Sequence, residues 1–172
     1  LIEMGAFSEE YLEYVVKNRP EFFGIPTGFP IYDQLIGGGL YIPGVHVMGG
    51  RSKQGKSFFG TNVSANVICG LDCKVLYLDT ELSSEIIADR ILAKVSKVTI
   101  DKIKNGSYAD DPKLKAQVDA VIPILKGKFF YKNIAGADHL EWISHARRWL
   151  MKEVGFDENG NIIPIPGAAP AK

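Results

Sequence analysis

GRSKQGKS, residues 50–57, is the stretch that decides the fold, because it fits the GxxxxGK[ST] pattern of a phosphate-binding loop. Glycines at positions 50 and 55 let the backbone turn so that several N–H groups face inward and cradle phosphate oxygens. In such a loop the lysine, here Lys56, reaches the β- and γ-phosphates, and the next hydroxyl, here that of Ser57, is a ligand of Mg²⁺. The stretch therefore predicts a P-loop that binds ATP or a similar nucleoside triphosphate together with Mg²⁺.

The segments on either side of the loop have the character that a P-loop requires. Val45–Met48 is short and apolar and is expected to be a strand. Residues 56–69 are expected to form a helix that ends at Gly70, and the positive end of its dipole favours an anion. That helix is expected to turn Phe58, Phe59, Val63, Val67 and Ile68 inward. The residues expected to contact the nucleotide are Gly50, Arg51, Ser52, Lys53, Gln54, Gly55, Lys56, Ser57 and Phe58.

Strands and helices continue to alternate after the loop. Val75–Leu78 is apolar throughout, as expected of a strand that is covered on both faces. Helix caps are expected at Ser8, Ser83 and Asp138, the last in a capping-box-like pair with Glu141. The other expected elements are helices at 8–17, 31–36, 83–95 and 100–104, a helix from Pro112 that Pro123 kinks or ends, a strand at 128–132 and a helix at 138–154. The alternation predicts an α/β domain whose sheet is mainly parallel and flanked by helices.

Two acidic residues follow the strand at 75–78. Asp79 and Glu81 lie where ligands bind in open α/β sheets, at the carboxyl end of a strand. A carboxylate in this place can accept a proton from, or orient, the water that attacks the γ-phosphate. The same residues can instead form a turn that leads into the helix beginning at Ser83. On the residues alone, both interpretations stay open.

The composition limits the class of protein. Twenty basic and twenty acidic residues cancel, so the net charge gives no general attraction to nucleic acid. No apolar run approaches the ~20 residues that cross a bilayer, so we expect a cytoplasmic protein without a membrane partner. Cys69 and Cys73 have no second pair of ligands at zinc spacing, and we expect two reduced thiols.

The approach to the loop resembles a known family. The segments that carry the resemblance are Pro26–Phe29, Tyr32–Leu35, Gly37–Leu40 and Pro43–Gly44. Together they are similar to the opening of the RecA-type ATPase domain of DnaB-family replicative helicases, which reads roughly TGFxxLDxLxGGLxPG. Leu78–Ser83 resembles the family's SLEMS segment, and residues 90–93 and 98–106 resemble its next helices. The resemblance covers about residues 24–150.

This resemblance implies a RecA-like fold, with Glu81 as the catalytic base beside Lys56. It implies that the intact protein couples ATP hydrolysis to translocation on single-stranded DNA and to duplex unwinding. The implied partners are further copies of the chain in a hexameric ring, a primase and a helicase loader. The helix at 8–17 resembles the linker that docks on a neighbouring subunit. A third glycine at 37–39 and the residues Arg51–Lys53 indicate a phage-type member, which would act in the cytoplasm of a bacterial host.

The end of the sequence departs from the family. The family has a Walker B element, an apolar strand ending in aspartate, after the helix that ends near Gly155. Residues 161–170 instead contain prolines at 164 and 166 and no aspartate, and such a segment does not form a central strand. We therefore expect a linker helix within residues 1–23 and a partial ATPase domain at 24–156, incomplete at its C-terminal end. Residues 157–172 are expected to be a turn and a proline-rich tail, as in a truncated or split protein.

Two other functions remain compatible with these residues. A RecA-type recombinase or recombination mediator also has a P-loop and a carboxylate after the next strand, although residues 27–29 and 98–106 fit the helicase better. A nucleotide-binding module without turnover is the other alternative, because Mg²⁺ is held less well without the Walker B aspartate. The prediction is a helicase fragment whose motor activity belongs to a longer protein.

Overall fold

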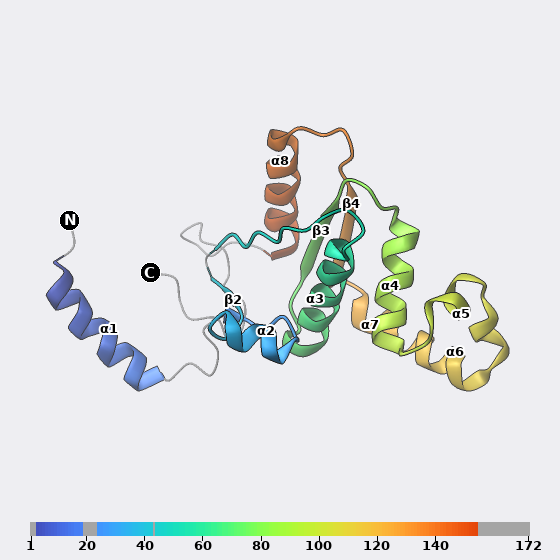
Figure 1. The fold of residues 1–172 in the computed structure, drawn as a ribbon, viewed down its shortest axis with the longest axis horizontal. Coiled ribbons are helices and arrows are strands. Elements are labelled where there is room, and N and C mark those ends of the chain that lie inside the picture. Colours follow the sequence, from blue (N-terminus) through green and yellow to red (C-terminus); the bar gives the residue numbers. More distant parts are fainter. Residues whose placement is uncertain (1–2, 19–23, 43, 155–172) are drawn as a thin grey trace. The chain divides into compact units, whose positions relative to one another are not determined.

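The computed structural model describes residues 3–18, 24–42 and 44–154 (Figure 1). The chain separates into two compact units, one within Leu1–His46 and the other within Val47–Ile165. The expected turn and proline-rich tail at 157–172, and with them the expected incompleteness, lie outside the described residues. In the described part, no helix is both long enough and apolar enough to span a membrane.

Helix α1, Met4–Asn18, begins earlier than the sequence predicts. The carboxylate of Glu3 accepts the amide N–H groups of Gly5 and Ala6, at 2.9 and 2.6 Å. The hydroxyl of Ser8 donates to the carbonyl of Met4, one turn back inside the helix, at 2.6 Å. The predicted cap at Ser8 is therefore wrong: an acidic side chain five residues earlier satisfies the free N–H groups of the first turn.

The rest of the first unit is a small hairpin around one helix. Strand β1, Gly24–Ile25, pairs antiparallel with β2, Leu40–Tyr41, and α2, Pro30–Leu35, lies between them in the chain, as predicted. A Cβ on Gly24 would lie 2.5 Å from the carbonyl oxygen of Leu40, and a Cβ on Gly39 would lie 2.5 Å from that of Ile25. Only glycine permits this close approach of the two backbones.

Asp33 of α2 closes the turn that leads out of β1. Its carboxylate accepts the amide N–H and the hydroxyl of Thr27, at 2.8 and 2.7 Å, and the amide N–H of Gly28 at 3.2 Å. Thr27 is completely buried. The Thr-Gly pair and the aspartate of the family-like opening thus form one hydrogen-bonded turn.

A parallel pair of strands organises the second unit. Strand β3, Val75–Asp79, pairs in parallel with β4, Phe129–Asn133, in the register Val75↔Phe129 to Asp79↔Asn133. Helices α3, Lys56–Leu71, and α4, Ser84–Ser96, cover one face. The side chains packed there are Ala65, Ile87 and Ile91 from the helices and Tyr77, Phe129 and Tyr131 from the strands.

Helix α8, His139–Trp149, covers the other face of this pair (Figure 1). The ring of Trp149 lies 5.6 Å from that of Phe130, edge to face. Because side chains alternate along a strand, Phe130 points away from the face that carries Phe129 and Tyr131. The described sheet is therefore a small parallel pair between two helical layers, and the predicted α/β class is confirmed.

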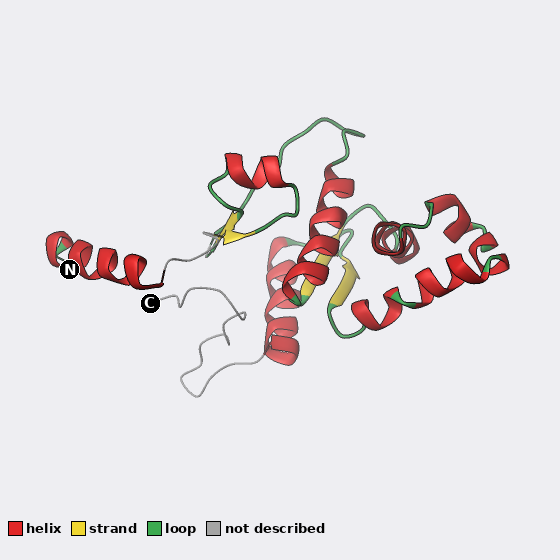
Figure 2. Cartoon of the chain, turned by 90° about the horizontal axis from the view of Figure 1, so that it is seen from below, coloured by secondary structure: helices red, strands yellow, loops and turns green. Residues whose placement is uncertain are grey.

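The segment between α4 and β4 folds into a small helical cluster of its own. It contains α5, Ile100–Lys104, the 3₁₀ helix η1, Ser107–Asp110, α6, Pro112–Asp119, and α7, Val121–Leu125. Val98, Ile103 and Val118 are its buried core. The carboxylate of Asp111 caps α6, and the helix breaks at Ala120, so Pro123 lies in the first turn of α7 rather than at the break. Figure 2 shows how much of the chain is helical and how short the strands are.

Several predicted details of the segments around the P-loop are wrong. Val45–Met48 is not a strand, and Val45 and Val47 are 92% and 90% exposed. An apolar sequence favours a strand, but the strand forms only with a hydrogen-bonding partner, and no described strand pairs with this segment. Helix α3 runs past Gly70 to Leu71, and its C-cap residue Asp72 has a left-handed backbone. Phe58 is exposed instead of packed. Thr61, Asn62 and Ser64 are also buried on α3. Their polar side chains tolerate this burial because they donate to carbonyls of the preceding turn.

The capping box of α8 is confirmed. Asp138 accepts the amide N–H groups of Leu140 and Glu141, at 2.8 and 2.9 Å, and Glu141 accepts that of Asp138 at 3.2 Å. Leu140 and Ile143 are exposed, because α8 contacts the sheet through its later part, at Trp149.

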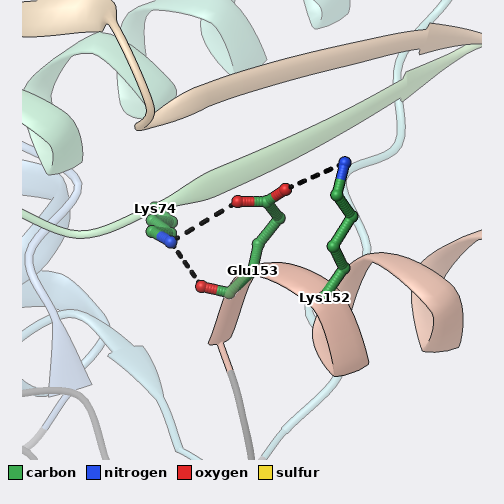
Figure 3. Close-up of polar contacts among 3 residues, drawn as sticks. All are labelled: Lys74, Lys152 and Glu153. Carbon is green, nitrogen blue, oxygen red and sulfur yellow. Dashed lines mark hydrogen bonds and ion pairs between the residues drawn. The ribbon is translucent and has the colours of Figure 1, made fainter.

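The helix ends in a π-helical turn, Leu150–Val154, that is held at the start of β3 (Figure 3). The ammonium of Lys74 donates to the carbonyl of Glu153 and lies 3.6 Å from its carboxylate, and Lys152 lies 3.6 Å from the same group. Exposed ion pairs of this kind contribute only about 0–1 kcal/mol, so these contacts fix the position of the turn more than they stabilise the fold.

The two cysteines are free thiols in different surroundings. Cys69 is exposed, whereas Cys73 is buried, and burial together with the neighbouring charge of Asp72 raises the pKa of the Cys73 thiol. Because the thiolate is the reactive form, we expect one thiol to react promptly with Ellman's reagent at pH 8 and the second only after unfolding. The Cys69→Ser variant should lose the fast reaction and Cys73→Ser should keep it. Two fast thiols in the native chain would contradict the described burial.

Candidate nucleotide-binding site

The glycine-rich loop curls around the side chain of Lys56. Its ammonium donates to the carbonyl oxygens of Gly50 and Arg51, at 2.9 and 3.0 Å. Lys53 and Gly55 have left-handed backbone angles, with φ of 62° and 89°. Helix α3 begins directly after Gly55, and the first N–H groups of a helix have no partner within the helix. The loop therefore brings a cation and free backbone donors to one place, which suits an anion.

The first turn of α3 is anchored to β3 through Tyr77. The hydroxyl of Tyr77 donates to the carbonyl of Ser57 at 3.4 Å, and Thr61 donates to the same carbonyl at 3.0 Å. Burial raises the pKa of Tyr77, and the charge of Asp79 adds to the effect, so the hydroxyl stays protonated at neutral pH and remains a donor.

The loop after β3 is shaped by Asp79. This residue is buried, and one of its carboxylate oxygens accepts the amide N–H groups of Glu81 and Leu82, at 2.6 and 2.7 Å. Ser83 occupies the predicted N-cap position of α4, but its side chain makes no cap hydrogen bond. The geometry thus supports the turn-forming interpretation of Asp79, whereas the side chain of Glu81 is exposed.

Both loops border one cleft of about 950 Å³ in the second unit. The predicted site residues that line it are Ser52, Lys53, Gly55, Lys56, Ser57, Phe58 and Glu81. Gly50, Arg51 and Gln54 are exposed in the same loop but lie outside this lining. The structure therefore brings Lys56, Ser57 and Glu81, the candidate catalytic and magnesium-binding residues, to the same cleft.

Three residues outside the P-loop, the start of α3, β3 and the loop after β3 also line the cleft, and the sequence assigned none of them to a site. They are Arg90 of α4, Ile134 after β4 and Trp142 of α8. One guanidinium nitrogen of Arg90 is buried and has no hydrogen-bond partner within the described residues. A basic residue three positions after the buried Ile87, on the inward side of a helix, was the available signal for Arg90. Ile134 and Trp142 carried no comparable signal.

The groups at the cleft fit a triphosphate that carries Mg²⁺. Lys56 is exposed and bonded only to carbonyls of its own loop, so its ammonium is able to turn toward phosphate oxygens. Ser57, half-buried at the start of α3, would supply one oxygen ligand of Mg²⁺. Mg²⁺ in nucleotide sites takes its other ligands largely from phosphates and water, so a single protein hydroxyl is a reasonable contribution.

Removing the carboxylate of Asp79 should destabilise the loop, because two amide groups lose their acceptor. We expect Asp79→Ala to lower the free energy of unfolding by about 2 kcal/mol in urea titration. Asp79→Asn, whose amide oxygen still accepts, should cost clearly less. Equal stability of Asp79→Ala and the wild type would show that the turn does not depend on this carboxylate.

Comparison with known proteins identifies the family to which this site belongs. Residues 24–157 match the family described as DnaB-like helicase C terminal domain. A probable plasmid replicative DNA helicase of Chlamydia psittaci is 23% identical over 84% of the chain, and the replicative DNA helicase DnaB of Haemophilus influenzae is 26% identical over 87%. The replicative DNA helicase DnaB of Pasteurella multocida is 28% identical over 81% of the chain.

The aligned segments make up 31%, 31% and 28% of these three relatives, so the chain spans less than a third of their length. The family match itself covers more than half of the 172 residues and contains both the P-loop and the loop after β3. The chain therefore belongs to the family of DnaB-like helicase C-terminal domains.

Proposed function

We propose that this chain is the ATP-binding part of a longer replicative DNA helicase. The observation that carries the proposal is the single cleft that contains Lys56 and Ser57 from α3 and Glu81 from the loop after β3. The membership in the helicase family supports it. The longer protein would couple ATP hydrolysis to translocation on single-stranded DNA and to unwinding of the duplex.

Each candidate residue of the cleft has a different role in the proposed hydrolysis of ATP. Lys56 leaves the carbonyls of Gly50 and Arg51 and binds the β- and γ-phosphates, while the free amides of the loop hold the remaining oxygens. Ser57 would hold Mg²⁺ in part, and the ion would neutralise charge on the phosphate oxygens. Glu81 orients the attacking water and accepts its proton. The oxygen of that water bonds to the γ-phosphorus as the bond from the γ-phosphorus to the bridging oxygen breaks, and ADP leaves.

The proposed partners follow from the family and from α1. Phe7, Leu12 and Val16 of α1 are exposed apolar side chains, which suits a linker helix that docks on a neighbouring subunit. We propose a ring, hexameric as in the family, of such subunits around single-stranded DNA, acting with a primase and a loader. Its place would be the cytoplasm, that of a bacterial host if the protein is encoded by a phage.

A nucleotide-binding module without turnover is the second candidate, and one observation favours it. Val45 and Val47 are almost fully exposed, so the segment that leads into the P-loop is not held within a sheet in this chain. A site that is held on one side only positions the phosphate less accurately, and hydrolysis is sensitive to such placement. ATP binding with no hydrolysis by the 172-residue chain would support this candidate, and robust hydrolysis by the chain alone would exclude it.

Lys56→Ala should weaken the binding of ATP by the chain roughly 10- to 100-fold, because a charge-assisted contact to phosphate contributes about 1.5–3 kcal/mol. Isothermal titration calorimetry with ATP and Mg²⁺ measures the affinity. Lys113→Ala, which removes an exposed lysine of α6, is the matched control and should bind as the wild type does. Equal affinities of the wild type and Lys56→Ala would contradict the assignment of the phosphate site.

Glu81→Gln should keep nucleotide binding but reduce DNA-stimulated ATP hydrolysis by the longer protein at least ~100-fold, the usual contribution of a general base. Steady-state hydrolysis with and without single-stranded DNA is the measurement. Glu85→Gln, an exposed residue in the first turn of α4, is the control and should hydrolyse ATP normally. Unchanged turnover in Glu81→Gln would remove Glu81 from the role of base.

A further inference from the structure

The carbonyl of Leu82, the residue after Glu81, accepts two side-chain donors from β4. The hydroxyl of Tyr131 donates to it, and the side-chain amide of Asn133 donates to it at 3.2 Å. The amide N–H of Leu82 donates to the carboxylate of Asp79 in β3 at 2.7 Å. Both polar backbone groups of Leu82 are therefore bonded to side chains of the two paired strands.

We infer that Tyr131 and Asn133 are positioning residues that hold the loop carrying Glu81 at the edge of the cleft. The inference rests on the proposed role of Glu81 as the base. A general base acts only within hydrogen-bond reach of the proton that it accepts, and a misplacement of 1 Å can cost about 10²-fold in rate. Glu81 is exposed, and its amide N–H is bonded to Asp79. The contacts of the neighbouring residue Leu82 with β4 therefore set the path of its backbone.

The parallel register explains why these two side chains meet the loop. Asn133 pairs with Asp79 at the end of the ladder, and Tyr131 pairs with Tyr77. Residues two apart on a strand point to the same face, so Tyr131 and Asn133 both face the side on which the chain leaves β3 for α4. Tyr131 also packs against the core of Ile87 and Ile91, which fixes its ring. The donors are thus held by the sheet and not by the loop that they bind.

A further contact orients the side chain of Asn133. Its carbonyl oxygen accepts the amide N–H of Ala135 at 2.8 Å, which leaves the NH₂ group to face the carbonyl of Leu82. An aspartate at this position keeps the acceptor for Ala135 but places a charged acceptor against the Leu82 carbonyl. Asn133→Asp therefore removes the donor and adds repulsion while hardly changing the size of the side chain.

The test combines Tyr131→Phe, Asn133→Asp and the double variant. Tyr131→Phe removes the hydroxyl and keeps the packed ring. Lys132→Ala is the matched control, since this exposed residue lies between the two on the same strand and points to the other face. In the longer protein, kcat and KM of DNA-stimulated ATP hydrolysis are measured. In the 172-residue chain, ATP affinity and amide hydrogen exchange of residues 80–83 are measured.

For the double variant we expect kcat to fall roughly tenfold, with KM and the affinity for ATP within about twofold of wild type. Exchange at the amides of Glu81 and Leu82 should become faster while that of β3 stays the same. Lys132→Ala should match the wild type in every measurement. This pattern separates positioning from a general loss of structure, which would move KM, affinity and exchange of β3 together.

A double variant with normal kcat, beside an inactive Glu81→Gln, would overturn the inference and leave the proposed function intact. So would a loss of kcat that is accompanied by weaker ATP binding and faster exchange throughout β3. Full turnover in Glu81→Gln would instead overturn the proposed role of Glu81. The exchange rates would then still test whether Tyr131 and Asn133 hold the loop. Unchanged exchange at residues 80–83 in the double variant would show that they do not.

Discussion

The parallel pairing of β3 with β4 is the constraint on which the cleft depends. Parallel strands end at the same edge, so Asp79 and Asn133, the last pair of the ladder, stand side by side. Tyr77 then holds the first turn of α3 at this edge through the carbonyl of Ser57. The P-loop and the loop after β3 border one cleft, because the first is tied to β3 through Tyr77 and the second continues directly from the same strand. A change of register would instead move Tyr131 and Asn133 of β4 away from the loop that follows β3.

Asp79 shows how a buried charge decides the roles of two neighbouring carboxylates. Burying a carboxylate costs several kcal/mol unless hydrogen bonds compensate, and two short bonds from backbone amides supply that compensation. Because one oxygen of Asp79 accepts both amide N–H groups, this carboxylate serves to form the turn. Glu81, whose side chain is exposed at the same edge, remains available to a ligand. The distinction comes from the direction in which the chain turns, and not from the chemistry of the side chains, which is the same.

The sequence predicted the features that neighbouring residues determine among themselves. The cap at Asp138, the start of a helix at Pro112, the helix after the P-loop and the strands β3 and β4 all depend on local patterns, and the structure confirms them. Val45–Met48 has the local pattern of a strand, but a strand also needs a partner from elsewhere, which no local pattern reports. The same reason applies to Phe58, which is exposed because burial depends on what lies opposite. Arg90 and Trp142 were missed because the cleft that they line is assembled from three helices and a sheet.

The site therefore has two kinds of determinant. The chemical groups, Lys56, Ser57 and Glu81, lie within 26 residues of one another in the chain, so a pattern search finds them. Their placement depends on contacts of long range: Tyr131 and Asn133 lie 49 and 51 residues beyond the carbonyl that they bind. A sequence motif can thus contain every reactive group without determining where those groups lie. Local residues supply the reactive groups, and the pairing of the strands sets the distances between them. For the same reason, the residues that position a base are best sought on the neighbouring strand of the sheet and not in the loop that carries it.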